Sequence, residues 1–335
     1  MSKFRVITDG SGDLTPELIK ERDITVVPFY VMLGSGDYLK QDVDIGTREF
    51  YEWMVSHPGV YPKSSTPSTQ DFLKVFREVA EAGDQAICIC ITEKFSNSYQ
   101  TARIALELLR EDYPDAKIAV YNSMVNTVLQ GLYVLEACDL RDAGFELDEA
   151  VKRLEEIRPT GRIFFTIGSI DYLSHGGRIG KLAGKVSTVL GIRPIITLKE
   201  GEIFPSGVCR GRGKSLDKTL SVAREYLREN FTSADEFDIA VGYGYDYNEA
   251  AEFQGRVAAL LDELGIRHEP YGEGYCTVDS VHSTSALIYK ATQAGATVFN
   301  CFSVEDVVFQ DNAVRGLVVN WAPVHREGLH VDPLV

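Results

Sequence analysis

The sequence predicts an α/β fold of two α/β domains, with a mainly parallel sheet in the first domain and a mixed sheet in the second. Short apolar runs alternate with amphipathic stretches of helical period through the first half of the chain, which implies right-handed crossovers and parallel strands. The regular alternation of strand and helix signals ends near residues 158–161, and a length of 335 residues suits two domains. We therefore place the domains at residues 1–158 and 159–335, with an extension after about residue 290.

In the first domain, each expected strand is an apolar run, and the helices carry recognisable start signals. Thr15 and Pro16 open one helix, because proline suits the first helical position. Ser68 and Asp71 form a capping box before another. The run at 86–91 is apolar throughout, which is typical of a strand buried on both faces. We expect strands at 4–8, 24–33, 86–91 and 118–121, and helices from residue 16, at 68–82, at 97–109 and at 125–138.

The second domain shows a different order of signals. An apolar run is followed by glycines at 176, 177 and 180, and then by two apolar runs around a polar turn at 199–202 that is typical of a hairpin. Two amphipathic stretches flank a further strand signal. We expect strands at 163–167 and 237–242, a hairpin over 194–204, and helices at 216–231 and 248–264.

The composition excludes several classes of partner. The net charge is −15, whereas binding to nucleic acid or to an anionic membrane surface needs basic surface. There is no signal-peptide pattern and no apolar stretch of membrane-spanning length, so we expect a cytoplasmic protein without stable membrane insertion. The six cysteines include no CxxC pair, and Cys88 and Cys90 alternate with isoleucines as small buried side chains do.

The sequence contains no complete match to the motifs for nucleotide hydrolysis or metal binding considered next. Residues 207–215 resemble a phosphate loop, but five residues separate the outer glycine from Gly213-Lys214 where the Walker pattern has four. There is no GxGxxG after a strand, no HExxH and no GxSxG. The only histidines near metal-ligand spacing are His325 and His330, in a proline-containing tail. We therefore expect neither a metal nor a cofactor.

Three hydroxyl-rich segments stand out, at residues 63–68, 93–99 and 279–285. Taken singly, serines before helices are usually caps and a lone histidine is usually structural. Together, two helix N-termini, several hydroxyls and His282 form a set of donors that suits a carboxylate or phosphate without a metal. No acidic partner for His282 can be chosen from the sequence, so a nucleophile–base–orienter triad is not indicated.

Several motifs, in the right order over roughly residues 4–290, resemble those of the DegV family. This family includes the fatty-acid-binding subunit of bacterial fatty acid kinase. Three departures are Thr66 for a glutamine, Asn97-Ser98 for Gly-Thr, and Ser283-Thr284-Ser285 after the histidine. The matching segments are 8–14 (Thr-Asp-Gly-Ser-Gly-Asp-Leu), 63–68 (Lys-Ser-Ser-Thr-Pro-Ser), 93–100, 122–123, 130–131, 171–179 (Asp-Tyr-Leu-Ser-His-Gly-Gly-Arg-Ile) and 190–195.

The resemblance implies a long-chain fatty acid or similar lipid held between the two domains, with no cofactor and no catalysis by the chain itself. It implies that Ser64, Ser65 and Ser96 bind the carboxylate together with His282. It also implies a separate, ATP-dependent kinase subunit that phosphorylates the bound lipid. Arg178 and Arg210 are the expected contacts with that kinase or with the phosphate.

The residues alone allow two other hypotheses to be weighed. The chain is alternatively an enzyme that acts on a small carboxylated or phosphorylated substrate, with His282 as acid or base. That reading needs a partner carboxylate in a polar cleft, and such a protein would copurify with no lipid. A role in transcription through direct DNA binding is disfavoured by the acidic charge and the lack of a basic helix.

Overall fold

The computed structural model describes residues 4–182, 192–231, 237–266, 268–270, 275–278, 304–310 and 313–319. The chain divides into one compact unit, Met1–Ser283, and a second, Thr284–Val335. In the second unit, β14 (Val304–Gln310) and β15 (Ala313–Val319) pair as an antiparallel hairpin. All of the predicted site residues belong to the first unit.

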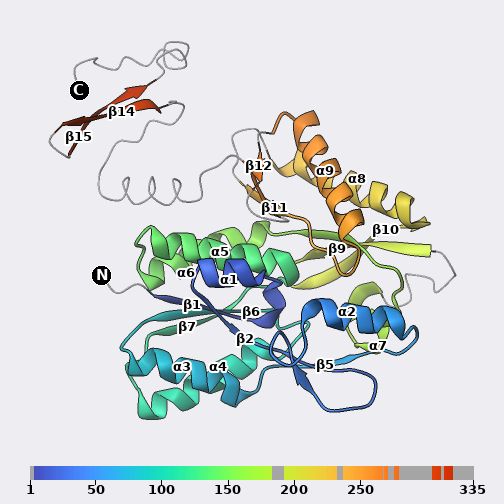
Figure 1. The fold of residues 1–335 in the computed structure, drawn as a ribbon, viewed down its shortest axis with the longest axis horizontal. Helices are drawn as coiled ribbons and strands as arrows, with labels where there is room; N and C mark the ends of the chain where they lie inside the picture. Colours follow the sequence, from blue (N-terminus) through green and yellow to red (C-terminus); the bar gives the residue numbers. More distant parts are fainter. Residues whose placement is uncertain are drawn as a thin grey trace. The chain divides into compact units, whose positions relative to one another are not determined.

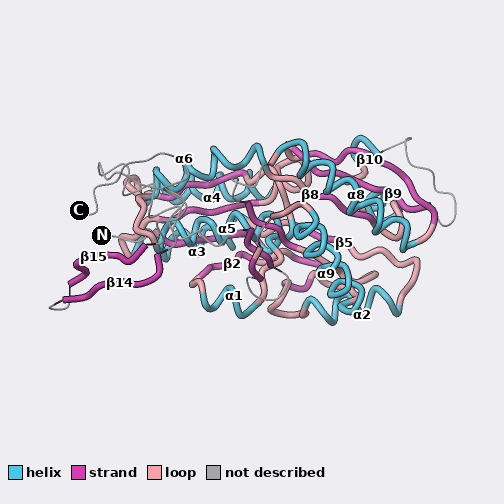
Figure 2. Tube along the Cα trace, turned by 90° about the horizontal axis from the view of Figure 1, so that it is seen from above, coloured by secondary structure: helices cyan, strands magenta, loops and turns pink. Residues whose placement is uncertain are grey.

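The first half of this unit is built on a four-stranded parallel sheet in the order β2-β1-β6-β7. Helices α3 and α4 cover one face of the sheet and α5 and α6 the other (Figures 1 and 2). The strands are β1 (Arg5–Asp9), β2 (Ile24–Val27), β6 (Ala86–Cys90) and β7 (Ile118–Asn122), and the helices are α1 (Pro16–Glu21), α3 (Thr69–Glu81), α4 (Ser98–Asp112), α5 (Thr127–Asp142) and α6 (Leu147–Ile157). The predicted parallel α/β domain is confirmed.

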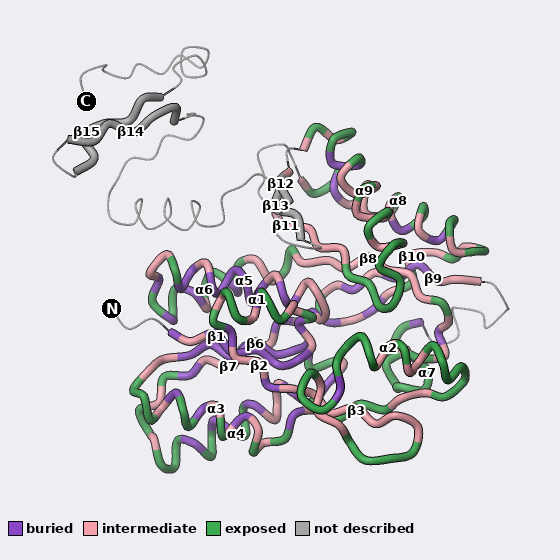
Figure 3. The backbone as a smooth tube through the Cα atoms, viewed as in Figure 1, coloured by how far each residue is buried: buried purple, intermediate pink, exposed green. Residues whose placement is uncertain are grey.

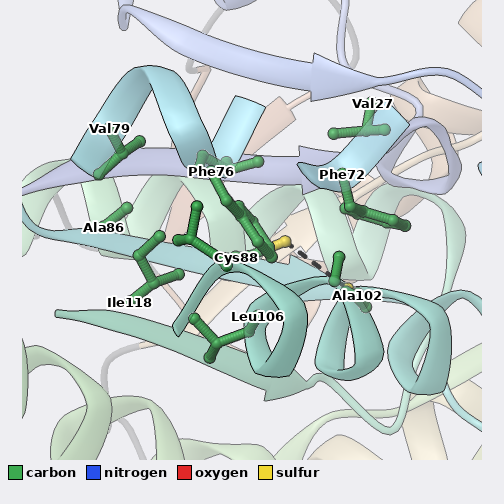
Figure 4. Close-up of a cluster of buried hydrophobic side chains, with 13 residues drawn as sticks. Val27, Phe72, Phe76, Val79, Ala86, Cys88, Ala102, Leu106 and Ile118 are labelled. Atoms are coloured by element: carbon green, nitrogen blue, oxygen red, sulfur yellow. Dashed lines mark hydrogen bonds between the residues drawn. The ribbon is translucent and has the colours of Figure 1, made fainter. Parts of the chain in front are cut away.

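Local sequence explains why these elements form where they do. All five residues of β6 are buried, as its continuous apolar run predicts (Figure 3). Ser68 and Asp71 make the predicted capping box at the start of α3, and the Thr15 side chain caps α1. Between the sheet and α3 and α4 lies a hydrophobic cluster that includes Phe72 and Phe76 (Figure 4).

A small antiparallel sheet follows β2 and differs from the prediction. The expected single strand at 24–33 is two strands, β2 and β3 (Tyr30–Met32), because Pro28 has no backbone N–H to continue the ladder. Strand β3 pairs with β4 (Leu39–Lys40) and β5 (Lys63–Ser65). Helix α2 (Thr47–Ser56) lies between β4 and β5 in the chain and was not predicted.

The second half of the unit is antiparallel in every pairing that the structure describes, where a mixed sheet was expected. The two sheets have the orders β10-β9-β8 and β11-β13-β12. Their elements are β8 (Ile163–Thr166), α7 (Asp171–His175), β9 (Ile192–Lys199), β10 (Glu202–Arg210), α8 (Arg212–Asn230), β11 (Phe237–Ala240), α9 (Tyr247–Glu263), β12 (Glu269–Pro270) and β13 (Tyr275–Val278). The predicted hairpin, helices and strands are present, with β9 and β10 longer than expected.

The β9–β10 turn contacts the first half of the unit. Its two central residues, Glu200 and Gly201, have φ values of 52° and 80°. Positive φ at both central residues is required by the two-residue hairpin turn whose twist matches that of the flanking strands. The carbonyl of Gly201 accepts a hydrogen bond from the Thr92 hydroxyl at 3.3 Å. A Cβ atom on Gly201 would lie 2.7 Å from the Thr92 Oγ1, so a glycine is needed at this contact.

In the part of the chain that the structure describes, no helix is long and apolar enough to cross a membrane. No group of three or more His, Cys, Asp or Glu side chains that could hold a metal ion occurs among the same residues.

Candidate ligand-binding site

A buried carboxylate organises the carboxyl ends of β1 and β6. Asp9 is fully buried at the end of β1. One of its oxygens accepts hydrogen bonds from Gln130 Nε2 at 2.9 Å and from the Ser11 hydroxyl at 2.5 Å. The other accepts from the Ile91 backbone N–H at 3.0 Å and from the Ser98 hydroxyl at 2.6 Å. Asp9 therefore ties the β1 loop, α5 and the β6–α4 loop together.

Ser96 lies in the β6–α4 loop that this network holds. Only 9% of Ser96 is exposed. Its Oγ accepts a hydrogen bond from the Ser98 N–H at 3.2 Å, and Asp9 fixes Ser98 in turn. The Ser96 O–H proton has no acceptor within the described residues. Because the oxygen already serves as an acceptor, the proton is free to be donated to a ligand.

The N-terminus of α4 adds a positive end beside Ser96. Helix α4 begins at Ser98, and the side chain of its N-cap residue, Asn97, makes no capping hydrogen bond. The Ser98 N–H is bound by the Ser96 Oγ, and the N–H groups that follow it in the first turn carry the positive end of the helix dipole. Together with the free Ser96 hydroxyl, this arrangement favours an anionic oxygen at this point.

Ser64 and Ser65 lie on β5, where both are exposed. Their backbones pair with Val31 and Tyr30 of β3. Neither hydroxyl has a hydrogen-bond partner in the described part of the chain, and no hydrogen bond there joins Ser64 or Ser65 to Ser96. Both hydroxyls are therefore available, on a different strand from the Ser96 loop.

The segment 171–178 contacts the chain at two places, just before Ser96 and shortly before β5. Arg178, which is exposed, donates a hydrogen bond from Nε to the carbonyl of Phe95 at 3.0 Å. In α7, three residues earlier, the His175 ring stacks on Tyr61 with centroids 3.8 Å apart. Phe95 immediately precedes Ser96, and Tyr61 precedes β5. The segment 171–178 therefore links the Ser96 loop to the chain that leads into Ser64 and Ser65.

The two remaining predicted residues are not joined to this cluster. Arg210 is exposed at the end of β10, where its backbone pairs with Ile192. No hydrogen bond joins Arg210 to the Ser96 loop within the described residues. His282 lies outside the residues that the structure describes.

The sequence-based prediction gives Asp9 no role of its own, beyond its place in the matching segment 8–14. Asp9 caps a short 3₁₀ helix, Gly10–Gly12, through Ser11 N. Its larger role comes from Gln130 and Ser98, which lie 121 and 89 residues away in the chain. The available signal was its position directly after a fully apolar strand, where a charged side chain needs buried partners.

A family model described as "Uncharacterised protein, DegV family" matches residues 3–278. The chain belongs to the DegV family. A DegV domain-containing protein of Clostridium acetobutylicum is 31% identical over 290 residues, which cover 86% of this chain and 98% of the relative. The predicted family membership is thus confirmed. A model of the Thi4 family also matches residues 249–335, a quarter of this DegV chain and too little to assign a second family.

Solved structures of other DegV-type proteins share the fold. A stearic acid-binding protein from Eubacterium ventriosum matches with a TM-score of 0.74 and 39% identity, over 77% of this chain and 88% of that one. A DegV family protein from Thermus thermophilus, described by its fatty acid binding, matches with a TM-score of 0.65 and 27% identity, over 77% and 88% of the two chains. The Streptococcus pneumoniae Fatty Acid Kinase B3 protein, loaded with linoleic acid, matches in fold at 22% identity with a TM-score of 0.63, over 79% and 90%.

Proposed function

We propose that this DegV-family chain is a cytoplasmic fatty-acid-binding protein that catalyses nothing alone and presents the bound carboxylate to a separate kinase subunit. The observation that carries the proposal is the free Ser96 hydroxyl proton at the N-terminus of α4. It is supported by the 39% identity to a stearic acid-binding protein. The fold likeness to the Fatty Acid Kinase B3 protein supports the kinase partner.

In this proposal the carboxylate accepts its hydrogen bonds from Ser96 and from Ser64 or Ser65, with His282 as a further donor. A hydrogen bond from a hydroxyl to an ionised carboxylate is stronger than one between neutral groups. The acyl chain is held between the domains 1–158 and 159–335, and its retention gains about 0.8 kcal/mol for each buried CH₂ group. Arg178 donates a hydrogen bond to the carbonyl of Phe95, the residue before Ser96, and is proposed to contact the phosphate. Arg210 is proposed to contact the kinase.

Replacing Ser96 by alanine tests the head-group assignment. Ser96→Ala removes the free hydroxyl proton and the acceptor of the Ser98 N–H, while the hydrogen bonds from the Ile91 N–H and the Ser98 hydroxyl to Asp9 remain. We expect the dissociation constant for stearate to rise about tenfold or more, since a hydrogen bond to a charged group is lost. Calorimetric titration of the delipidated protein measures this change.

A matched control is Ser35→Ala, at an exposed position in the loop before β4. Its stearate affinity is expected to equal that of the unaltered protein. If both variants, each shown to be folded by circular dichroism, bind stearate alike, Ser96 does not hold the head group.

A further inference from the structure

A cavity lies on the β10-β9-β8 sheet, and the predicted head-group serines are not part of it. It has a volume of about 390 Å³ and is open to solvent. Neither Ser64, Ser65 nor Ser96 lines it. Its lining comprises three aromatic rings, two hydroxyls and two cationic side chains: Phe164, Phe204, Tyr226, Thr197, Ser206, Arg162 and Lys199.

The two cations line the same cavity and lack acidic partners within the described residues. Arg162 immediately precedes β8, and Lys199 is the last residue of β9, next to the paired residues Ile163 and Leu198. Like charges that share one cavity repel each other. No acidic side chain bridges either of them within the described ranges, although the whole protein has 49 acidic and 34 basic residues. Two uncompensated cations in so acidic a chain indicate a place for an anion.

The neighbouring acidic residue is already engaged. Glu202 pairs with Lys199 in the strand register, but its carboxylate forms an ion pair with Lys181. The hydrogen bond from Lys181 lowers the pKa of Glu202, so the carboxylate is engaged by Lys181 and not by Lys199. The local excess of two positive charges therefore comes from Arg162 and Lys199.

The remaining donors point to an oxyanion with several acceptor oxygens. Arg162 uses Nη1 for the carbonyls of Pro159 and Gly161, at 2.7 and 2.8 Å, and its other nitrogens have no partner within the described residues. The hydroxyls of Thr197 and Ser206 are 2.5 Å apart. One hydroxyl donates to the other, which leaves one hydroxyl proton for a ligand.

The aromatic rings provide an apolar floor beside these donors. Phe164 and Tyr226 have ring centroids 5.4 Å apart, and the Arg162 guanidinium lies over the Tyr226 ring at 5.5 Å. Lys199 lies over the Phe204 ring at 5.2 Å. These contacts hold both cations at the edge of the cavity, where an anion with an apolar body would meet charge and ring together.

We propose that this cavity binds the phosphate monoester of a small molecule with a flat apolar body. A phosphate monoester carries a charge of about −1.5 to −2 near pH 7 and three acceptor oxygens, which match two cations and a hydroxyl. The site is independent of the lipid head-group site, because no residue is shared between them.

Phenyl phosphate serves as the probe, with benzoate as a singly charged ring and inorganic phosphate as a ringless anion. We expect saturable binding of phenyl phosphate in a phosphorus NMR titration of the whole protein. Benzoate and inorganic phosphate, each added as a competitor to bound phenyl phosphate, are expected to displace it only at higher concentration. Arg162→Gln and Lys199→Gln are each expected to weaken phenyl phosphate binding about tenfold, by loss of a charge-assisted hydrogen bond.

The control is Lys152→Gln, which removes one positive charge at an exposed position on α6. It should change phenyl phosphate affinity less than about twofold, since Lys152 does not line the cavity and solvent and salt screen an exposed charge. Three results overturn the inference: no saturable binding, equal weakening by Lys152→Gln, or competitive displacement by stearate. The last would make the cavity part of the lipid site. Failure of Ser96→Ala to affect stearate leaves this test untouched.

Discussion

Asp9→Ala is expected to lower the free energy of unfolding by about 3–5 kcal/mol. The substitution removes the buried acceptor of five hydrogen-bond donors, namely the N–H and the hydroxyl of Ser11, the Ile91 N–H, the Ser98 hydroxyl and the Gln130 amide. Each buried donor that loses its partner costs about 1–3 kcal/mol, and entry of water offsets part of the sum. Urea denaturation followed by circular dichroism measures the change.

Asp37→Ala is the matched control, because Asp37 is exposed in the loop before β4. Its effect on the unfolding free energy is expected to stay within about 0.5 kcal/mol, as for surface substitutions in general. A loss below about 1 kcal/mol for Asp9→Ala would show that the Asp9 network does not hold the β1 and β6 loops together.

Phe76→Ala is expected to destabilise the first unit by about 3–5 kcal/mol, the usual cost of removing a buried phenyl ring. Phe76 is a fully buried residue of α3, with its ring centroid 5.9 Å from that of Phe72, in a cluster that includes Cys88 and Leu106 (Figure 4). These neighbours belong to a strand and to α4, so the cavity left behind cannot close by one side-chain rotation.

Val55→Ala on α2 is the comparison, since 54% of Val55 is exposed. It is expected to change the unfolding free energy by less than about 0.5 kcal/mol in the same urea titration. Equal effects of Phe76→Ala and Val55→Ala would mean that the α3–α4 cluster contributes little to the stability of the parallel sheet.

The parts of the fold that were predictable are those with strong local signals. The apolar run of β6, the capping box of α3 and the turn at Glu200-Gly201 each specify their own geometry. Strand β5 and helix α2 were missed because β5 is exposed and polar, and α2 contains no buried residue. Neither carries the periodic burial that reveals an element in sequence.

The candidate site was predictable in its residue types but not in its organisation. Hydroxyls before helices suggested an anion site, and the structure places Ser96 with a free proton at such a helix. The Asp9 network depends on contacts between residues more than 80 positions apart, which no local pattern encodes. Arg162 and Lys199 line one cavity because β8 and β9 are paired, which became visible only with the fold.

Native mass spectrometry of the freshly purified protein, followed by organic extraction, tests the central claim that this chain carries a fatty acid. We expect one fatty acid for each chain, with the protein-bound mass identified in the extract. An apoprotein that also fails to take up added stearate or oleate would contradict the claim. The free Ser96 hydroxyl would then require a different anion.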